Sequence, residues 1–360
     1  MKFADSKRLR YVVYLISVTL LILLVFNIFI TLRIHRQLAR IGVKHGRWPL
    51  GAYIYDPKIG FDFAPGISGP IGDGTFYVKS HQLGYRIAKD TDPVSWQPGG
   101  LLSLGCSFTY GDEVEAGQTF TELAAEGLNI PAYNYGICSF SYTHAILKAQ
   151  KLKDEGILDQ LQPRYVVLGC WSGLPDRSKS PFPPLVTGNI PLPAAYMTKD
   201  GKDVSIQYPM NIQGLFDLIE SYRHDGTRLS FNRFVKIYFS APRYFFLYMK
   251  NQSVARKLKA GSFNKSLTEY EVYDFYFSAI EKLFSEYNSK IIVLYMPNKP
   301  EEGPDIALKQ ALAKHPEIVF ANGLYALHKN GVSILDYVGI HPTPIAHQAY
   351  AKEIIADLNK

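Results

Sequence analysis

LLSLGCSFTYG, residues 101–111, is the stretch that decides the fold of this chain of 360 residues. It begins as a short, mostly apolar run of strand length and turns at Gly105, which puts Cys106 and Ser107 just beyond the strand. Buried strands that alternate with helical stretches are typical of a parallel sheet with crossover helices. The stretch therefore opens an α/β domain that we expect to begin near Gly99.

The same alternation continues to the end of the chain. We expect strands at residues 101–105, 132–136, 165–169, 290–296 and about 317–322, and helices around 144–152, 270–287, 305–314 and 343–358. Residues 178–262 interrupt the alternation with a Pro-rich and aromatic insertion, and no solenoid-type repeat appears in the sequence. Residues 51–98 are rich in Gly, Pro and Tyr with short extended pieces, which predicts a small β-rich cap.

An apolar segment precedes these elements. Residues 11–32 read YVVYLISVTLLILLVFNIFITL, 22 residues without a charge, and about 20 such residues cross a bilayer. A buried core helix would carry a polar stripe, and a cleaved signal peptide would be followed by a small-residue site rather than by arginines, so we expect a retained transmembrane helix. Basic residues flank both of its ends, so charge does not choose its orientation. The expected organisation is a tail at 1–10, the transmembrane helix at 11–32, a linker and cap at 33–98, and the α/β domain at 99–360.

The composition excludes several classes of protein. With 47% hydrophobic and only 20% charged residues, the chain is neither a coiled coil nor an acidic, disordered tail. The net charge is +7, but the basic residues partly gather beside the apolar segment, which favours a membrane surface over nucleic acid as the partner. The sequence contains no nucleic-acid-binding motif.

Candidate catalytic residues lie where open α/β sheets bind ligands, beyond the carboxyl ends of the strands. Ser107, at the first strand-to-helix turn, would have an exposed hydroxyl and a backbone N–H available to a developing oxyanion, although a serine there can also cap the helix. His341 precedes the last helix, with Asp336 nearby and His347 within that helix. A histidine beside a carboxylate is the general base that a serine nucleophile needs, although either histidine could instead be a packed loop residue.

These stretches together resemble the SGNH, or GDSL-type, hydrolase family, on the strength of GCSFTYG at 105–111, NYGICS at 134–139 and HPTPIAH at 341–347. The resemblance covers residues 100–358 apart from the insertion, and the preceding YDPKIGFDFAPG and HQLGYR stretches are similar to the extension of membrane-anchored bacterial members. It implies a flavodoxin-like three-layer sheet, Ser107 as the nucleophile, His341 as the base, and hydrolysis or transfer of esters, often acetyl groups on glycans. It implies no cofactor and no metal.

The chain departs from the family pattern at four positions. Cys106 stands where the first block usually has Asp, and Ser139, which follows Asn134 in the second block, aligns with the oxyanion Gly of that block. Gly173 stands where the oxyanion Asn of the third block is expected. Val338 stands where the family has the Asp of the triad. Loss of one oxyanion donor costs roughly 10²- to 10³-fold in rate. The backbone N–H groups of Ser107 and Ser139 would remain, and Asp336 could reach His341 if the loop bulges.

Two interpretations of the function stay open. The first is a membrane-anchored serine esterase or acyltransferase that acts on ester groups of a cell-envelope glycan or lipid, at the inner membrane with its globular domain in the periplasm. The second is a catalytically inactive subunit of the same fold, which serves as a membrane-bound binding or assembly protein with other membrane proteins as partners. Turnover of an ester would distinguish them.

The three cysteines, Cys106, Cys138 and Cys170, fall at the carboxyl ends of the first three expected strands. An odd number without CxxC spacing indicates no disulfide framework. In the strand order that the family implies, the thiols could lie close together as metal ligands or as a redox pair, but free cysteine is usually a small buried apolar side chain.

Residues 233–259, within the insertion, mix Lys and Arg with Phe and Tyr. That mixture suits the headgroup boundary of a bilayer. Aromatic residues at helical spacing are more often core, and Pro242 splits the segment, so a lid over the ester site and a protein-contact surface are rival interpretations.

Overall fold

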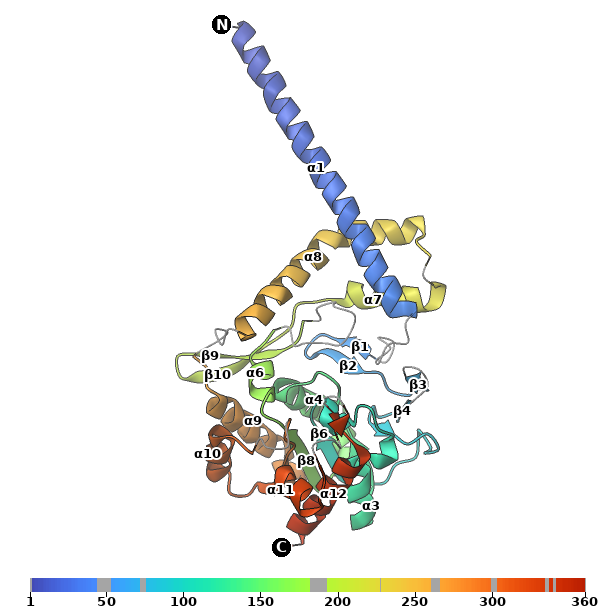
Figure 1. Ribbon diagram of the computed structural model, residues 1–360, viewed down its shortest axis with the longest axis vertical. Coiled ribbons are helices and arrows are strands. Elements are labelled where there is room, and N and C mark those ends of the chain that lie inside the picture. Colours follow the sequence, from blue (N-terminus) through green and yellow to red (C-terminus); the bar gives the residue numbers. More distant parts are fainter. Residues whose placement is uncertain are drawn as a thin grey trace.

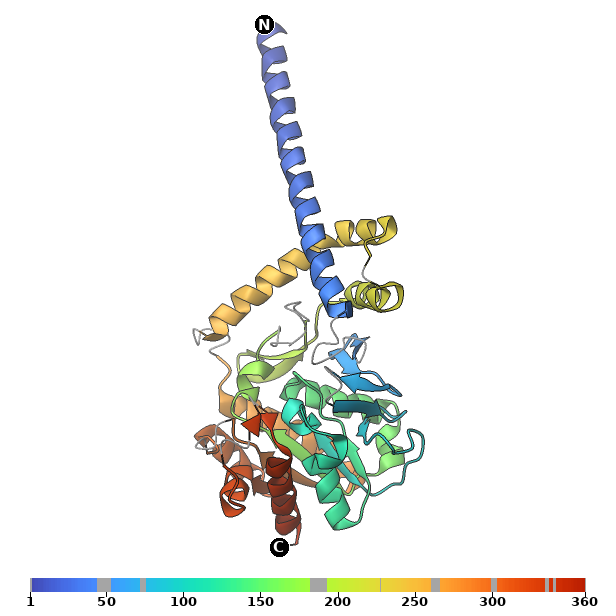
Figure 2. The ribbon, with the colours of Figure 1, turned by 45° about the vertical axis from the view of Figure 1, so that its right-hand side comes forward.

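The computed structural model describes residues 2–43, 53–71, 76–181, 193–226, 228–259, 266–298, 303–333, 337–338 and 341–359. An α/β domain lies at the carboxyl-terminal end of the molecule, and one long helix, α1 (Lys2–Val43), projects from the opposite end (Figure 1 and Figure 2). Helices from the insertion surround the base of α1.

The central sheet is mostly parallel. Its parallel strands are β6 (Leu101–Leu104), β7 (Ala132–Asn134), β8 (Tyr165–Cys170), β11 (Lys290–Tyr295) and β12 (Val319–Asn322), in the spatial order β12-β11-β8-β6-β7. Counted along the chain, this is the 2-1-3-4-5 order of flavodoxin-like sheets. The expected strands and the expected fold class are confirmed, because the apolar runs of β6, β8 and β11 are buried between two helical layers.

The expected helices are confirmed with small shifts at their ends. They are α4 (Tyr142–Asp154), α9 (Glu269–Phe284) with a 3-10 turn at Ser285–Tyr287, α10 (Ile306–Lys314) and α12 (Pro344–Leu358). Shorter elements are α2 (Ser107–Tyr110), a 3-10 turn at Ala116–Gln118, α3 (Phe120–Leu128), α5 (Ile157–Leu161), α6 (Leu174–Ser178) and α11 (Gly323–Lys329). Helix α3 packs on α12, and α4 packs on α9, which contacts α10. Crossovers between parallel strands are as a rule right-handed, which puts these two groups on opposite faces of the sheet.

In the part of the chain that the structure describes, five strands precede the parallel sheet. Strands β3 (Ser68–Ile71), β4 (Phe76–Ser80) and β5 (Arg86–Ile87) extend the sheet in antiparallel fashion beyond β7. Strands β1 (Tyr53–Asp56) and β2 (Gly60–Phe63) form a separate antiparallel hairpin. The β-rich segment expected before residue 99 therefore has two parts, one of which is the edge of the central sheet. Short strands carry no local signal of the strand with which they pair.

The described part of the insertion contains a hairpin and two long helices. Strands β9 (Tyr196–Asp200) and β10 (Asp203–Gln207) pair antiparallel, and α7 (Gln213–Asp225) and α8 (Phe231–Lys259) follow. Pro242 lies inside α8, where a proline removes a backbone hydrogen bond and bends a helix. Both helices pack against α1 (Figure 1 and Figure 2).

Helix α1 contains the expected apolar span. From Lys7 to Ala39 it is long and apolar enough to cross a membrane. Its apolar side chains are exposed over most of this length, whereas Ile30, Ile34 and Leu38 near its base are buried in the protein.

Two buried clusters organise the molecule. One surrounds the parallel sheet, and the second joins buried residues of α1, α7, α8 and the β1–β2 hairpin to those of the strand-end loops. The ring centroids along this second cluster are 6.2 Å apart for Tyr55 and Phe216, and 5.7 Å apart for Phe61 and Phe140 and for Phe63 and Tyr110. The carboxyl end of the parallel sheet therefore faces the base of α1 through the β1–β2 hairpin.

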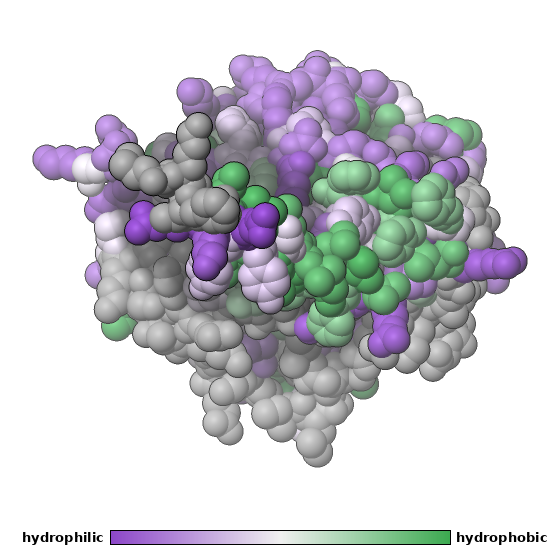
Figure 3. Space-filling model, turned by 90° about the horizontal axis from the view of Figure 1, so that it is seen from above, coloured by the Kyte–Doolittle hydropathy of each residue, from purple (hydrophilic) through white to green (hydrophobic). Residues whose placement is uncertain are grey.

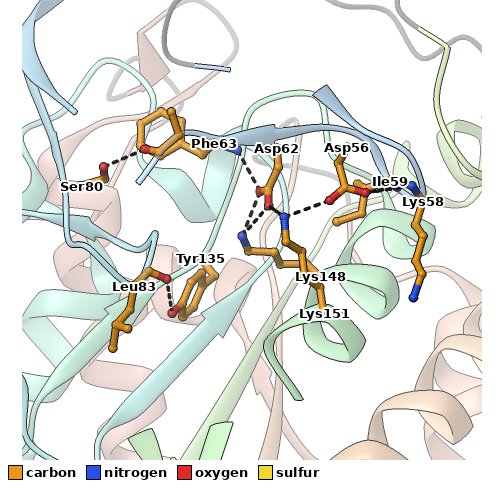
Figure 4. Close-up of polar contacts among 11 residues, drawn as sticks. Asp56, Lys58, Ile59, Asp62, Phe63, Ser80, Leu83, Tyr135, Lys148 and Lys151 are labelled. Carbon is orange, nitrogen blue, oxygen red and sulfur yellow. Dashed lines mark hydrogen bonds and ion pairs between the residues drawn. The ribbon is translucent and has the colours of Figure 1, made fainter. Parts of the chain in front are cut away.

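A buried ion cluster fixes that hairpin on α4 (Figure 4). Lys148 Nζ donates to both carboxylate oxygens of Asp62 at 2.9 Å, and Lys151 Nζ bridges Asp62 and Asp56, also at 2.9 Å. Burial by itself would raise the pKa of Asp62, but the two ammonium groups hold that pKa below its usual value. Removing one partner would leave a buried charge uncompensated, so the cluster holds the hairpin in place over the strand-end loops.

Candidate active site

Ser107 lies at the tight turn that leaves β6. A Cβ on Gly105 would lie 2.2 Å from Thr109 Oγ1, so glycine is what lets the chain turn this closely. Cys106 is the N-cap of α2 and makes no side-chain capping bond. Ser107 is therefore the first residue of α2 and not its cap, so the capping role that the sequence left open is wrong.

His341 reaches Ser107 from the other end of the chain. It begins β14 (His341–Pro342), which pairs with β13 (Tyr337–Val338) just before α12. Its Nε2 lies 3.0 Å from Ser107 Oγ, across 234 residues of sequence. The imidazole is buried, and the ring of Phe108 meets it edge-on with centroids 5.6 Å apart. The structure thus brings the two residues into the contact that a nucleophile and its general base make.

A carboxylate that sequence reasoning missed lies beside this pair. Asp112 Oδ2 is 3.6 Å from His341 Nε2, and the Asp112 N–H donates to the Ser107 carbonyl at 3.0 Å. Because Asp112 faces the nitrogen that receives the serine proton, it is placed to stabilise the imidazolium rather than to orient the ring through Nδ1. The available signal was the Gly111-Asp112 pair directly after α2, where a left-handed glycine ends the helix and folds the chain back.

Asp336, the expected triad acid, lies outside the described residues. At Val338, where the family has its Asp, the backbone pairs with His341 in the β13–β14 hairpin. The orienting acid therefore stays a prediction.

Two buried side chains clamp the segment that follows the nucleophile. Arg86 of β5 donates hydrogen bonds of 2.6, 2.8 and 2.6 Å to the backbone carbonyls of Tyr110, Gly111 and Val114. Asn134 Nδ2 donates to the Thr109 carbonyl at 3.0 Å, and Asn134 Oδ1 accepts from the Gly136 N–H. The resemblance of NYGICS to the second family block implies an oxyanion or binding role for Asn134. In the structure its amide instead positions α2 and the loop that carries Asp112.

The loop after β7 contacts the turn that carries the nucleophile. Ser139 has a φ of +68°, the left-handed conformation that favours glycine, which fits its alignment with a family glycine. Among the described residues, no acceptor takes a hydrogen bond from its N–H. The Ile137 N–H donates to the Gly105 carbonyl at 3.1 Å and so ties this loop to the turn before Ser107.

At Gly173, where an oxyanion Asn was expected, a side chain would have to displace the indole of Trp171. A Cβ there would lie 2.2 Å from two ring carbons of Trp171. Trp171 stacks on Phe108 with ring centroids 5.6 Å apart and 15° between the planes, and the Arg177 guanidinium lies 5.4 Å from its ring. An indole therefore fills the space beside Gly173, and an oxyanion would depend on backbone donors.

The remaining candidates are structural. His347 is buried, accepts from the Phe120 N–H at 3.2 Å and stays neutral, because burial lowers its pKa to about 3. Cys106, Cys138 and Cys170 are buried free thiols, and burial raises the pKa of Cys138 and of Cys170. Within the described ranges, no group of three His, Cys, Asp or Glu side chains could hold a metal ion, so the thiolate metal site has no support there.

No family model matches the chain, and no curated protein matches its sequence. Solved structures match at low identity. A member of the lipolytic G-D-S-L family from Veillonella parvula is 11% identical, with 72% of this chain and 98% of that chain covered and a TM-score of 0.35. An alpha/beta hydrolase enzyme from the metagenome of Lake Arreo, Spain, is 11% identical, with 73% and 97% covered and a TM-score of 0.36.

A carbohydrate esterase family 2 enzyme with a carbohydrate binding domain, from Corynascus thermopiles, is 10% identical, with 76% of this chain and 71% of that chain covered and a TM-score of 0.36. The roles of individual residues rest on the geometry of this chain.

Proposed function

We propose that the chain is a membrane-anchored serine esterase or acyltransferase that acts on O-acyl ester groups of a cell-envelope substrate through Ser107 and His341. The observation that carries the proposal is the 3.0 Å contact between Ser107 Oγ and His341 Nε2. A substrate close to the membrane fits this assignment, because the strand-end loops share a buried cluster with the base of α1.

In this reaction Ser107 Oγ attacks the ester carbonyl carbon while its proton passes to His341 Nε2. The oxyanion accepts hydrogen bonds from the backbone N–H groups of Ser107 and Ser139, and the carboxylate of Asp112 stabilises the imidazolium. When the ester C–O bond breaks, the imidazolium returns its proton to the leaving alcohol, and the acyl group stays on Ser107. Water then releases the acid in a hydrolase, or a second hydroxyl takes the acyl group in a transferase.

Turnover of p-nitrophenyl acetate by the full-length chain in nanodiscs tests this function. We expect Ser107→Ala to lower turnover by at least ~10³-fold, because a serine nucleophile has no substitute within its site. Ser205→Ala, on an exposed serine of β10, is the matched control and should keep wild-type turnover. Equal turnover by wild type and Ser107→Ala would contradict the proposal.

A second candidate is an inactive SGNH-fold subunit that binds or assembles with membrane proteins. The observation that favours it is the indole of Trp171 beside Gly173, where an oxyanion Asn was expected. Absence of turnover by wild type, together with unchanged complex formation by Ser107→Ala, would favour this subunit over the enzyme.

For the location, we propose the inner membrane, with α1 as a single span and the globular domain in the periplasm. The support is the apolar length of α1 and the resemblance to membrane-anchored members that act on envelope glycans. Protease added to spheroplasts should digest the chain beyond residue 50. Protection of that region would place the domain on the other side of the membrane.

A further inference from the structure

A side-chain hydrogen bond joins α1 to α8 at the backbone carbonyl that Pro242 leaves without a helical partner. Pro242 has no backbone N–H, so the carbonyl of Tyr238, four residues earlier in α8, loses its helical partner. The side-chain amide of Asn27, in α1, donates to that carbonyl at 3.1 Å. A polar residue within the apolar run of α1 thus satisfies a carbonyl that the proline frees.

This contact lies within the apolar part of α1. Phe26, next to Asn27, meets Phe245 of α8 edge-on, with ring centroids 5.7 Å apart. A groove of about 780 Å³ lies between the two helices and is lined almost wholly by apolar side chains, among them Leu23 and Met249. In hydrocarbon no water is present to pair with a free carbonyl, so a bond such as that of Asn27 is what a helix bent inside a bilayer requires.

The exposed surface of α8 continues the exposed apolar surface of α1. Phe239 is 78% exposed, and Phe246, which also lines the groove, is 63% exposed. Seen from above, hydrophobic side chains gather in one broad area on the side of the molecule that carries α1 and α8 (Figure 3). Lys236 is exposed on α8 among these aromatic residues, as at the headgroup boundary of a membrane. Arg243 is also exposed, but its guanidinium donates to the Asn211 carbonyl.

We propose that α8 is a second membrane element, which lies in the bilayer interface against α1 with Phe239 and Phe246 among the acyl chains and Lys236 at the headgroups. Its partner is the lipid bilayer, because the apolar surface of α8 is continuous with the surface that α1 turns to lipid. A second line of membrane contact would limit rotation of the α/β domain about the axis of α1. The proposal rests on α1 being the membrane span of the proposed function, and it does not depend on catalysis.

The proposal is tested by adding one tryptophan at a time to the chain, in nanodiscs whose phosphatidylcholine carries bromine on its acyl chains. Leu15→Trp reports on α1, Phe239→Trp on α8, and Ile306→Trp on an equally exposed apolar position of α10, 74% exposed. Each emission is measured as the difference from wild type, which has three tryptophans. We expect a blue shift and a bromine-dependent loss of emission at positions 15 and 239, and neither at position 306.

Loss of emission at position 15 without loss at position 239 would overturn the proposal for α8 and leave α1 as the membrane span. Loss at neither position would overturn the membrane contact of both helices. Because a tryptophan at 239 could disturb the fold, the wild-type chain is also labelled in the same nanodiscs with an apolar diazirine. Label in peptides from 231–246 supports the proposal. Absence of label there contradicts it, including the case in which a second protein copy covers α8.

The bond from Asn27 has its own test in hydrogen exchange of the α8 amides. Asn27→Leu should accelerate exchange across residues 231–246, because the Tyr238 carbonyl loses its donor. In a Pro242→Ala background the restored N–H at position 242 pairs with that carbonyl, so Asn27→Leu should add little. Equal acceleration in the two backgrounds would contradict the role of this bond in docking α8.

Discussion

His341 faces two oxygen groups with one nitrogen. Its Nε2 lies 3.0 Å from the Ser107 hydroxyl and 3.6 Å from the Asp112 carboxylate. A carboxylate at this nitrogen helps where positive charge develops, but it does not select the tautomer, which depends on the acceptor at Nδ1. We therefore expect two acids with two tasks, Asp112 at Nε2 and Asp336 at Nδ1.

The orienting acid is tested by Asp336→Asn, which we expect to lower kcat by up to ~10⁴-fold because the wrong tautomer then faces Ser107. Asp336 is the only Asp or Glu between Glu317 and Glu353. The measurement is turnover of a small acetyl ester by wild type, Asp336→Asn and His341→Ala. A large loss for His341→Ala with unchanged Asp336→Asn would replace the triad by a Ser-His dyad, and activity that survives both changes would reject the catalytic assignment.

Asp112 has a smaller and different expected effect. Asp112→Asn should lower kcat by roughly 10- to 100-fold and leave KM nearly unchanged, because the lost attraction exists mainly when the imidazole is charged. Asp90→Asn, on an exposed carboxylate, is the matched control. A wild-type kcat for Asp112→Asn would show that its proximity to His341 has no catalytic role.

At the scale of elements, the clamp formed by Arg86 makes the edge strand β5 part of the site. The guanidinium bonds three carbonyls, one at the end of α2 and two beyond it, and its planar fork cannot be reproduced by an ammonium group. We expect Arg86→Lys to lower the free energy of unfolding by about 2 kcal/mol or more, since buried carbonyls are left unpaired. It should also lower kcat, because α2 and Asp112 lose their support.

The control for this clamp is Arg164→Lys, at an exposed arginine whose guanidinium lies over Tyr165. It should change neither the unfolding midpoint nor kcat. An Arg86→Lys chain with wild-type stability and turnover would show that the clamp does not position the site.

Helix α4 carries a pH-sensitive cap. Nδ1 of His144 accepts from the Ser141 N–H at 3.1 Å, and burial, followed by the charge of Arg177, lowers the pKa of this histidine to about 3. Because the folded-state pKa lies below the usual value of 6.5, the fold favours the neutral imidazole. The stability that the neutral His144 imidazole adds to the fold is fully present above about pH 6.5 and is lost as the pH falls toward about 3.

We expect His144→Gln to flatten the loss of stability on acidification. At pH 5 the titration of His144 lowers the free energy of unfolding of the wild type by about 2 kcal/mol relative to neutral pH. A glutamine keeps the capping-box contact and does not titrate. The measurement is the unfolding midpoint between pH 7.5 and pH 4 by circular dichroism. Buried His347 titrates in the same direction, so a residual slope is expected, and parallel curves for wild type and His144→Gln would contradict the prediction.

For the whole molecule, the parallel sheet and the pairing of Ser107 with His341 could be predicted because their signals are local. The apolar runs of β6, β8 and β11 are long enough to be read as buried strands, and both residues stand directly beside elements of known direction. Sheet topology then brings the two ends of the chain together.

What could not be predicted depends on partners distant in sequence. The amide of Asn134 bonds backbone carbonyls of α2, and the ring of Trp171 closes the space at Gly173; neither contact leaves a pattern in the residues around it. The antiparallel addition of β5 to β7 brings Arg86 to the site, and two-residue strands carry almost no periodicity.

A fluorophosphonate probe forms a covalent bond only with an activated serine, so its labelling of the full-length chain in nanodiscs decides whether Ser107 is the nucleophile. We predict that peptide mass spectrometry finds the probe on Ser107 in wild type, that labelling is much slower in His341→Ala, and that it is absent in Ser107→Ala. Equal labelling of wild type and Ser107→Ala, or a probe found on another serine, would contradict the assignment.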